Sequence, residues 1–123
     1  MILGLRTAIY YVADVQAAKE WYTLVLGHGP YFDEPFYVGY SVGGYELGLH
    51  PDESKVTKGD NVLVYWGVED AQSEHKRLLE LGATPHNDIQ DVGDGILVAT
   101  VKDPWDNAFG IIQNPHFKVE GGG

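Results

Sequence analysis

The chain contains one pattern of segments twice, and this internal repeat limits its fold more than any other feature. The sequence Tyr-Val-Ala-Asp at 11–14 matches Gly-Val-Glu-Asp at 67–70, and Leu26-Gly27 matches Leu81-Gly82. Before each Asp lies a segment typical of a strand, and after it apolar residues recur at three- and four-residue steps, as on one face of a helix. Each repeat is therefore predicted to form one strand, one helix and about three further strands.

The helix ends carry the clearest local signals in both repeats. In the first, a strand over 5–12 leads to Asp14, a favourable N-cap, and Gly27 ends the helix. In the second, Asp70 and Gly82 occupy the same two positions after a strand over 62–68. The remaining predicted strands cover 31–33, 36–42, 45–50, 84–90, 96–102 and 109–113, with a two-residue hairpin turn at Gly43-Gly44.

The closing stretch, Asp-Pro-Trp-Asp-Asn-Ala-Phe-Gly at 103–110, is predicted to reverse the chain between its last two strands. Gly110 falls inside the second of them. A glycine within a strand indicates that another group approaches the backbone closely, so a ligand is expected there.

The repeat predicts an α+β fold in a single domain over 1–123. The two modules cover 1–52 and 60–116, a polar linker covers 51–60, and a flexible tail covers 117–123. Each module alone would expose one face of a small curved sheet. We therefore expect two βαβββ modules to pair into a curved mixed sheet, with the helices on the outer face and a concave cleft inside.

Charge and composition disfavour several classes of partner and site. The formal charge of −10 disfavours nucleic acid and anionic membrane surfaces, which are bound mainly through Lys and Arg. The chain has no Cys, which excludes thiolate catalysis and disulfides. No segment approaches the ~20 apolar residues of a membrane helix, and the N-terminus lacks a secretory pattern. A cytoplasmic protein is expected.

Several motifs in order resemble the glyoxalase/bleomycin-resistance/dioxygenase superfamily, which has the vicinal oxygen chelate fold. They are the Tyr-Val-Ala-Asp helix entry, the helix exit Trp-Tyr-Thr-Leu-Val-Leu-Gly at 21–27 and the closing stretch at 103–110. The resemblance covers nearly the whole chain. It implies membership of a group that includes isomerases, ring-cleaving dioxygenases, antibiotic-modifying enzymes and metal-free antibiotic-sequestering proteins. Relatives of the last kind are commonly dimers, so a homodimer is expected.

The resemblance also implies where a metal would be held, and this chain departs from that pattern. The ligand positions fall on Thr7, Leu63, Gly48 (or Glu46 with the register shifted) and Gly110. Thr is a poor ligand for a divalent ion, and Leu and Gly have no side-chain donor. We therefore expect no metal and no other cofactor.

Strand alternation from Thr7 predicts an apolar and aromatic concave face. The residues predicted to bind the ligand are Thr7, Tyr11, Glu46, His50, Leu63, Tyr65, Trp105 and Gly110. Phe36, Tyr40 and Trp105 are predicted to line the mouth of the cleft. Alternatively, these aromatic side chains fill the curvature of the sheet as core.

Glu46 is the candidate base if the protein catalyses a reaction. A carboxylate among apolar groups would have a raised pKa and could accept a proton near neutral pH. Tyr11 or Tyr65 would then donate a hydrogen bond to a developing oxyanion.

The sequence favours a metal-free protein that binds a small hydrophobic or aromatic molecule in the cleft. One alternative is a lyase or isomerase resembling lactoylglutathione lyase. The other is a non-catalytic structural protein whose own side chains fill the cleft. Whether the chain is an enzyme stays open at this point.

Overall fold

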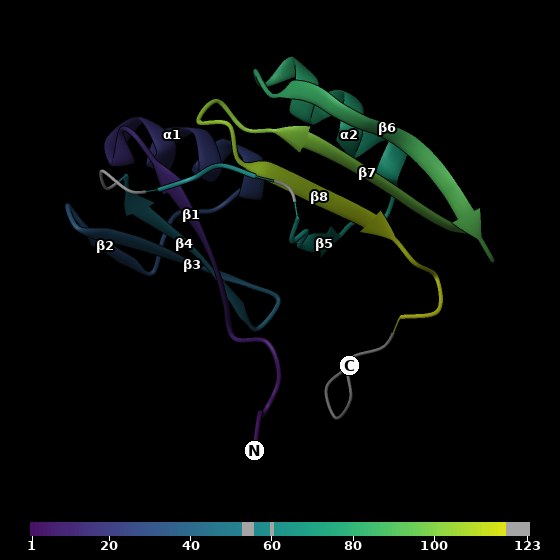
Figure 1. The fold of residues 1–123 in the computed structure, drawn as a ribbon, viewed down its shortest axis with the longest axis horizontal. Coiled ribbons are helices and arrows are strands. Elements are labelled where there is room, and N and C mark those ends of the chain that lie inside the picture. The colour runs from purple at the N-terminus through teal and green to yellow at the C-terminus, as the bar shows by residue number, and fades with distance from the viewer. Residues whose placement is uncertain (53–55, 60, 118–123) are drawn as a thin grey trace. The chain divides into compact units, whose positions relative to one another are not determined.

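The computed structural model describes residues 1–52, 56–59 and 61–117, and the chain divides into two compact units, Met1–Lys58 and Gly59–Gly123. Each unit contains a strand, a helix and three more strands in that order (Figure 1). Parts of the predicted linker and tail, residues 53–55, 60 and 118–123, lie outside the described residues. The predicted α+β class and the repeated βαβββ order are confirmed.

Unit 1 consists of a four-stranded mixed sheet and one helix. Its strands lie in the order β1-β4-β3-β2, with β1 parallel to β4 and the other pairs antiparallel. The elements are β1 (Thr7–Val12), α1 (Val15–Leu26), β2 (Phe32–Glu34), β3 (Tyr37–Val42) and β4 (Tyr45–Pro51).

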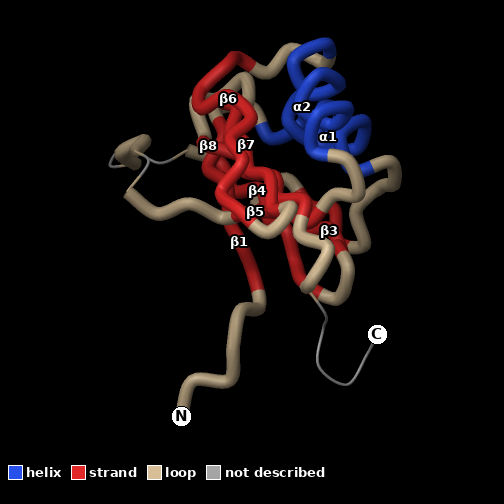
Figure 2. Tube along the Cα trace, turned by 90° about the vertical axis from the view of Figure 1, so that its right-hand side faces the viewer, coloured by secondary structure: helices blue, strands red, loops and turns tan. Residues whose placement is uncertain are grey.

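Helix α1 begins and ends where the capping residues predict. The Asp14 carboxylate accepts from the Ala17 N–H at 3.1 Å, and Gly27 closes the helix in the left-handed conformation with φ of 81°. Its buried side chains, Ala18, Trp21 and Tyr22, face the sheet, and Figure 2 shows the helix on one side of its strands. Packing therefore fixes one face of the sheet as core.

The strands of unit 1 alternate between this core face and a second face. Tyr10 stacks on Tyr22 of α1 with ring centroids 5.9 Å apart, and the Tyr40 hydroxyl donates to the Lys19 carbonyl of α1 at 2.9 Å. The core face also contains Ala8, Val12, Val38, Leu47 and Leu49. The opposite side, called here the open face of unit 1, carries Thr7, Ile9, Tyr11, Phe32, Tyr37, Gly39, Glu46, Gly48 and His50.

One prediction about this sheet is wrong. Tyr40, expected at the mouth of the pocket, is fully buried on the core face. Because Tyr40 lies opposite Leu47 in the β3–β4 register, its side chain points to the same side as Leu47, under α1.

Unit 2 repeats this architecture, with strands in the order β5-β8-β7-β6. Strand β5 is shorter than predicted. The C-cap of α2 is Leu81 and not Gly82 as predicted, and Gly82 follows it with φ of 110°. β5 is parallel to β8, and the other pairs are antiparallel. The elements are β5 (Tyr65–Gly67), α2 (Ala71–Glu80), β6 (Thr84–Gly93), β7 (Ile96–Lys102) and β8 (Ala108–Gln113).

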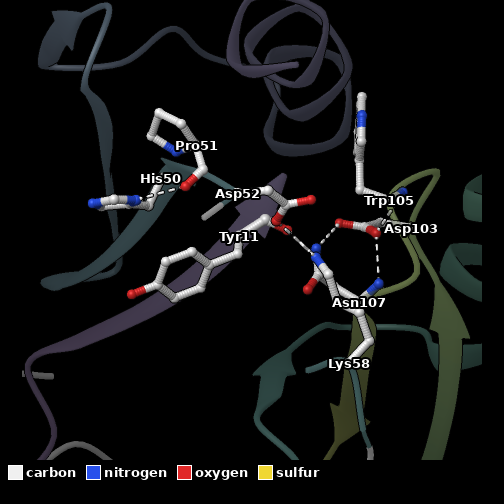
Figure 3. Close-up of polar contacts among 8 residues, drawn as sticks. All are labelled: Tyr11, His50, Pro51, Asp52, Lys58, Asp103, Trp105 and Asn107. Carbon is white, nitrogen blue, oxygen red and sulfur yellow. Dashed lines mark hydrogen bonds and ion pairs between the residues drawn. The ribbon is translucent and has the colours of Figure 1, made fainter. Parts of the chain in front are cut away.

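The predicted reversal between β7 and β8 is confirmed, and Asp103 holds it. This side chain is only 2% exposed. Its carboxylate accepts from the backbone N–H groups of Trp105 (2.9 Å) and Asn107 (2.8 Å) and from Asn107 Nδ2 (3.0 Å; Figure 3). Asp106 occupies the left-handed region with φ of 68°. The turn is therefore organised by a buried carboxylate that binds backbone donors.

Among the residues that the structure describes, no helix is long and apolar enough to cross a membrane.

Candidate functional site

The open face of unit 1 has a hydrogen-bond cluster centred on the Glu46 carboxylate. Thr7 Oγ1 donates to Oε1 at 2.8 Å, the Tyr37 hydroxyl donates to Oε1 at 3.0 Å, and the Tyr31 hydroxyl donates to Oε2. Thr7 lies opposite Glu46 in the β1–β4 pair, and Tyr37 lies on β3, the other neighbour of β4. The sheet register thus brings three hydroxyl groups from distant positions to one carboxylate.

Two glycines make room for this cluster. Gly39 and Gly48 lie opposite each other on β3 and β4. A Cβ at Gly39 would stand 2.6 Å from Glu46 Oε2, and a Cβ at Gly48 would stand 2.7 Å from Tyr37 Cζ. Any other residue at either position would displace the acidic or the phenolic side chain, so the cluster depends on both glycines.

The hydroxyl donors lower the pKa of Glu46. The hydrogen bond from Tyr31 is the largest cause, and burial opposes it, while the bonds from Thr7 and Tyr37 add to the lowering. The raised pKa expected for a catalytic base is therefore wrong. The reason is that an apolar strand pattern reveals burial but not the three donors that favour the charged carboxylate.

The two phenols respond in the opposite direction. Burial, followed by the hydrogen bond and the charge of Glu46, raises the pKa of Tyr37 to about 12. The hydrogen bond to Glu46 likewise raises the pKa of Tyr31. Near neutral pH the cluster is therefore one carboxylate surrounded by neutral hydroxyl groups.

No cation neutralises this carboxylate within the described part of the chain. The three hydroxyl groups account for its contacts, and the ion pairs formed by Lys19 and Lys58 go to Asp33 and Asp52. The half-buried Glu46 thus carries a negative charge that is hydrogen-bonded but forms no ion pair with any residue that the structure describes.

The two tyrosines that contact this carboxylate lie near two further aromatic side chains. The Phe32 ring lies 6.1 Å from that of Tyr37 and 6.0 Å from that of Phe36, centroid to centroid. Tyr31 is 66% exposed, Phe36 63% and Phe32 39%. We call Tyr31, Phe32, Phe36 and Tyr37 the aromatic rim. Contiguous exposed aromatic surface of this kind marks ligand or partner sites more often than isolated apolar residues do.

A second pair on the open face joins β1 and β4. The rings of Tyr11 and His50 lie 4.9 Å apart at 47° (Figure 3). His50 Nδ1 lies 2.9 Å from the Pro51 carbonyl oxygen, which can only accept, so Nδ1 is the donor in this hydrogen bond. Lys58 donates to the Tyr11 carbonyl and pairs with Asp52 at 3.4 Å.

The structure brings together some of the residues predicted to bind the ligand. Within unit 1, Thr7 meets Glu46 and Tyr11 meets His50. Tyr31, Phe32 and Tyr37 were missed by sequence reasoning. Their aromatic character at the edges of predicted strands was the only available signal, because their contacts with Glu46 and with one another follow from the pairing of β2, β3 and β4.

The remaining predicted residues belong to unit 2. At Gly110, an added Cβ would stand 2.5 Å from the Val64 carbonyl oxygen and 2.8 Å from Tyr65 Cδ1. The close approach that the glycine predicted is thus made by the chain's own backbone and ring. Leu63 and Trp105 are half-buried, and Tyr65 is 39% exposed.

The positions that would hold a metal in related proteins do not fit a divalent ion here. The Thr7 hydroxyl donates a hydrogen bond to Glu46, Leu63 has no side-chain atom that could bind a metal, and tyrosine rings lie over Gly48 and Gly110. Across residues 1–52, 56–59 and 61–117, no group of three or more His, Asp or Glu side chains could hold a metal ion.

Comparison with known proteins identifies the family. The model of the Glyoxalase/Bleomycin resistance protein/Dioxygenase superfamily matches residues 4–111. No curated protein matches the chain.

Solved structures show the same fold at low identity. A glyoxalase-related enzyme from Fulvimarina pelagi is 17% identical, with a TM-score of 0.79 over 99% of this chain and 96% of that one. A glyoxalase/bleomycin resistance protein/dioxygenase family enzyme from Burkholderia phytofirmans PsJN is 19% identical, with a TM-score of 0.76 over 90% and 98%. A lactoylglutathione lyase from Agrobacterium tumefaciens is 17% identical, with a TM-score of 0.73 over 94% and 98%.

Proposed function

This chain belongs to the glyoxalase/bleomycin resistance protein/dioxygenase superfamily, and on that premise we propose that it binds a small aromatic molecule on the open face of unit 1 without a metal ion. The observation that carries the proposal is the aromatic rim: Tyr31 and Tyr37 donate hydrogen bonds to the charged Glu46, and the rings of Tyr31 and Phe36 stay largely exposed.

Exposure of the rim favours a binding surface over a filled core. The core of unit 1 lies on the other side of the sheet, where Tyr22, Tyr40, Leu47 and Leu49 are fully buried. Tyr31 and Phe36, in contrast, leave most of their surface accessible. Aromatic rings with a few fixed polar groups are typical of small-molecule sites.

The chemistry of Glu46 supports a role in binding. Its lowered pKa makes the carboxylate a weak proton acceptor near neutral pH, because three donors stabilise its charged form. The same donors hold it in one orientation, which suits recognition of a ligand. We therefore propose Glu46 as a binding residue and not as a general base.

Family membership also supports two further proposals, a homodimer and a cytoplasmic location. Sedimentation velocity of the purified chain tests the first, with a single species of twice the chain mass expected. Fractionation of cells that express the tagged chain tests the second, and recovery in the membrane pellet would contradict it.

A thermal-shift and calorimetric screen tests the binding function. It uses aromatic antibiotics, thiol conjugates and divalent ions. An aromatic compound present at about 100 times its Kd should stabilise the folded chain by about 2.7 kcal/mol. Phe36→Ala should weaken that binding, whereas Leu24→Ala, which removes an exposed apolar side chain from α1, should not.

Two other outcomes would contradict the proposal. Metal-dependent turnover of a thiol conjugate would show that the protein is a lyase or isomerase. No shift with any compound would favour a structural protein.

A further inference from the structure

We propose that the ligand of the open face carries a protonated amine, which donates one N–H to Glu46 Oε2 while its alkyl groups and aromatic part lie on the aromatic rim. This inference rests on the proposed function and names the chemical class of its ligand.

The acceptor positions of Glu46 that remain unused leave room for one N–H group of the ligand. An ionised carboxylate offers about four lone-pair sites, two on each oxygen. Oε1 accepts from Thr7 and Tyr37, and Oε2 accepts from Tyr31 alone. One acceptor position on Oε2 is therefore left for the ligand.

The charge of the cluster favours a cationic donor. Hydroxyl groups stabilise a carboxylate but do not cancel its charge, and no basic side chain among the described residues contacts Glu46. The negative charge therefore stays available to attract a cation placed beside Oε2. The net charge of −10 adds a favourable field for the approach of a cation.

The aromatic rim suits an alkylated ammonium group. Tyrosine and phenylalanine faces attract cations within about 6 Å of the ring centroid, and methyl groups on nitrogen spread the charge over that surface. Tyr31 is both the donor to Oε2 and the most exposed ring of the rim, at 66%. The free acceptor position and an accessible aromatic face thus lie at the same place.

Three probes of similar shape separate the contributions. N,N-dimethylbenzylamine is protonated at pH 7 and has one N–H, benzyltrimethylammonium has the charge without the N–H, and benzyl alcohol has neither. Titration of each into the isotope-labelled full chain, followed by NMR, should give the tightest binding for the amine. We expect about fivefold weaker binding of the trimethylammonium probe and weaker binding still of the alcohol.

Glu46→Gln keeps the shape of the side chain and removes its charge. It should weaken amine binding about tenfold and weaken binding of benzyl alcohol, which carries no charge, by clearly less. Glu20→Gln is the matched control, because Glu20 is an exposed residue of α1, which packs on the core face. Raising the pH until the amine loses its proton should abolish its preference over the alcohol, a readout that needs no variant.

The outcomes separate this inference from the proposed function. Equal binding of the amine and the alcohol would overturn the cationic ligand and leave an aromatic site in place. Equal binding of the amine and the trimethylammonium probe would overturn the N–H bond to Oε2. If no probe binds, the inference fails, and the aromatic screen then decides the proposed function on its own.

Discussion

Tyr37 lies so close to Gly48 that a Cβ on the glycine would stand only 2.7 Å from ring carbon Cζ. Tyr37 is on β3 and Gly48 is on β4, and the contact lets the phenol reach Glu46, two residues from Gly48 on the same face. A position without a side chain thus fixes the geometry of the carboxylate cluster.

Gly48→Ala should break the bond between Tyr37 and Glu46. The added methyl group displaces the ring, so we expect a loss of about 1–2 kcal/mol of unfolding free energy and a rise in the pKa of Glu46. Denaturant unfolding and an NMR titration of Glu46 measure the two effects. Gly29→Ala is the control, because an added Cβ there meets nothing within 4 Å. An unchanged pKa of Glu46 in Gly48→Ala would show that the hydrogen bond from Tyr37 does not contribute to the lowering.

The lowered pKa of Glu46 predicts a loss of stability in acid. A carboxyl group whose pKa is lower in the folded state than in the unfolded state stabilises the fold at any pH above its ordinary pKa, which is 4.5 for Glu46. This contribution disappears as the pH falls through the pKa of the folded state. The stability difference between the wild type and Glu46→Gln should therefore shrink below pH 4.5.

Tyr31→Phe provides the comparison for this titration. It removes the largest cause of the lowering, so the pKa of Glu46 should return toward its ordinary value and the acid-dependent contribution should decrease. Equilibrium unfolding at a series of pH values checks both variants. A stability difference that does not change with pH would show that Glu46 titrates alike in both states.

Tyr40→Phe should destabilise the chain without affecting the ligand. Its hydroxyl donates to the Lys19 carbonyl at 2.9 Å and lies 3.1 Å from Thr23 Oγ1, so its removal should cost about 1 kcal/mol. Because Tyr40 is on the core face, binding of aromatic probes should be unchanged. Tyr37→Phe should instead weaken binding of the amine probe. Calorimetric titration of both variants measures these affinities. If only Tyr40→Phe changed the affinity, the ligand would not lie on the open face.

Asp103→Ala should destabilise unit 2. It leaves the N–H groups of Trp105 and Asn107 without their buried carboxylate acceptor, at a cost of about 2–3 kcal/mol. Asp106→Gly, in the same turn, should be neutral or stabilising by up to about 1 kcal/mol, since φ at that residue is 68°. Thermal unfolding compares the two. A small effect of Asp103→Ala would show that the turn forms without its carboxylate.

Local chemistry in the sequence predicted the repeated order of elements. Asp14, Gly27 and Asp70 cap their helices as expected, because a cap depends on residues within one turn of itself. The β7–β8 reversal was predicted for the same reason. The shorter β5, Tyr65–Gly67, differs from the predicted 62–68, since a strand ends where its partner ceases to pair and not where β-branched residues stop.

Tertiary structure decided the site. The bond between Thr7 and Glu46 joins residues 39 positions apart, and that between Tyr31 and Glu46 spans 15, so both exist only once the strands have paired in one register. That register also determined that Tyr40 belongs to the core and that the pKa of Glu46 falls instead of rising. Sequence alone supplied the elements and their order because these depend on neighbours along the chain. The electrostatics of Glu46 came from hydroxyl groups that only the folded sheet places beside it.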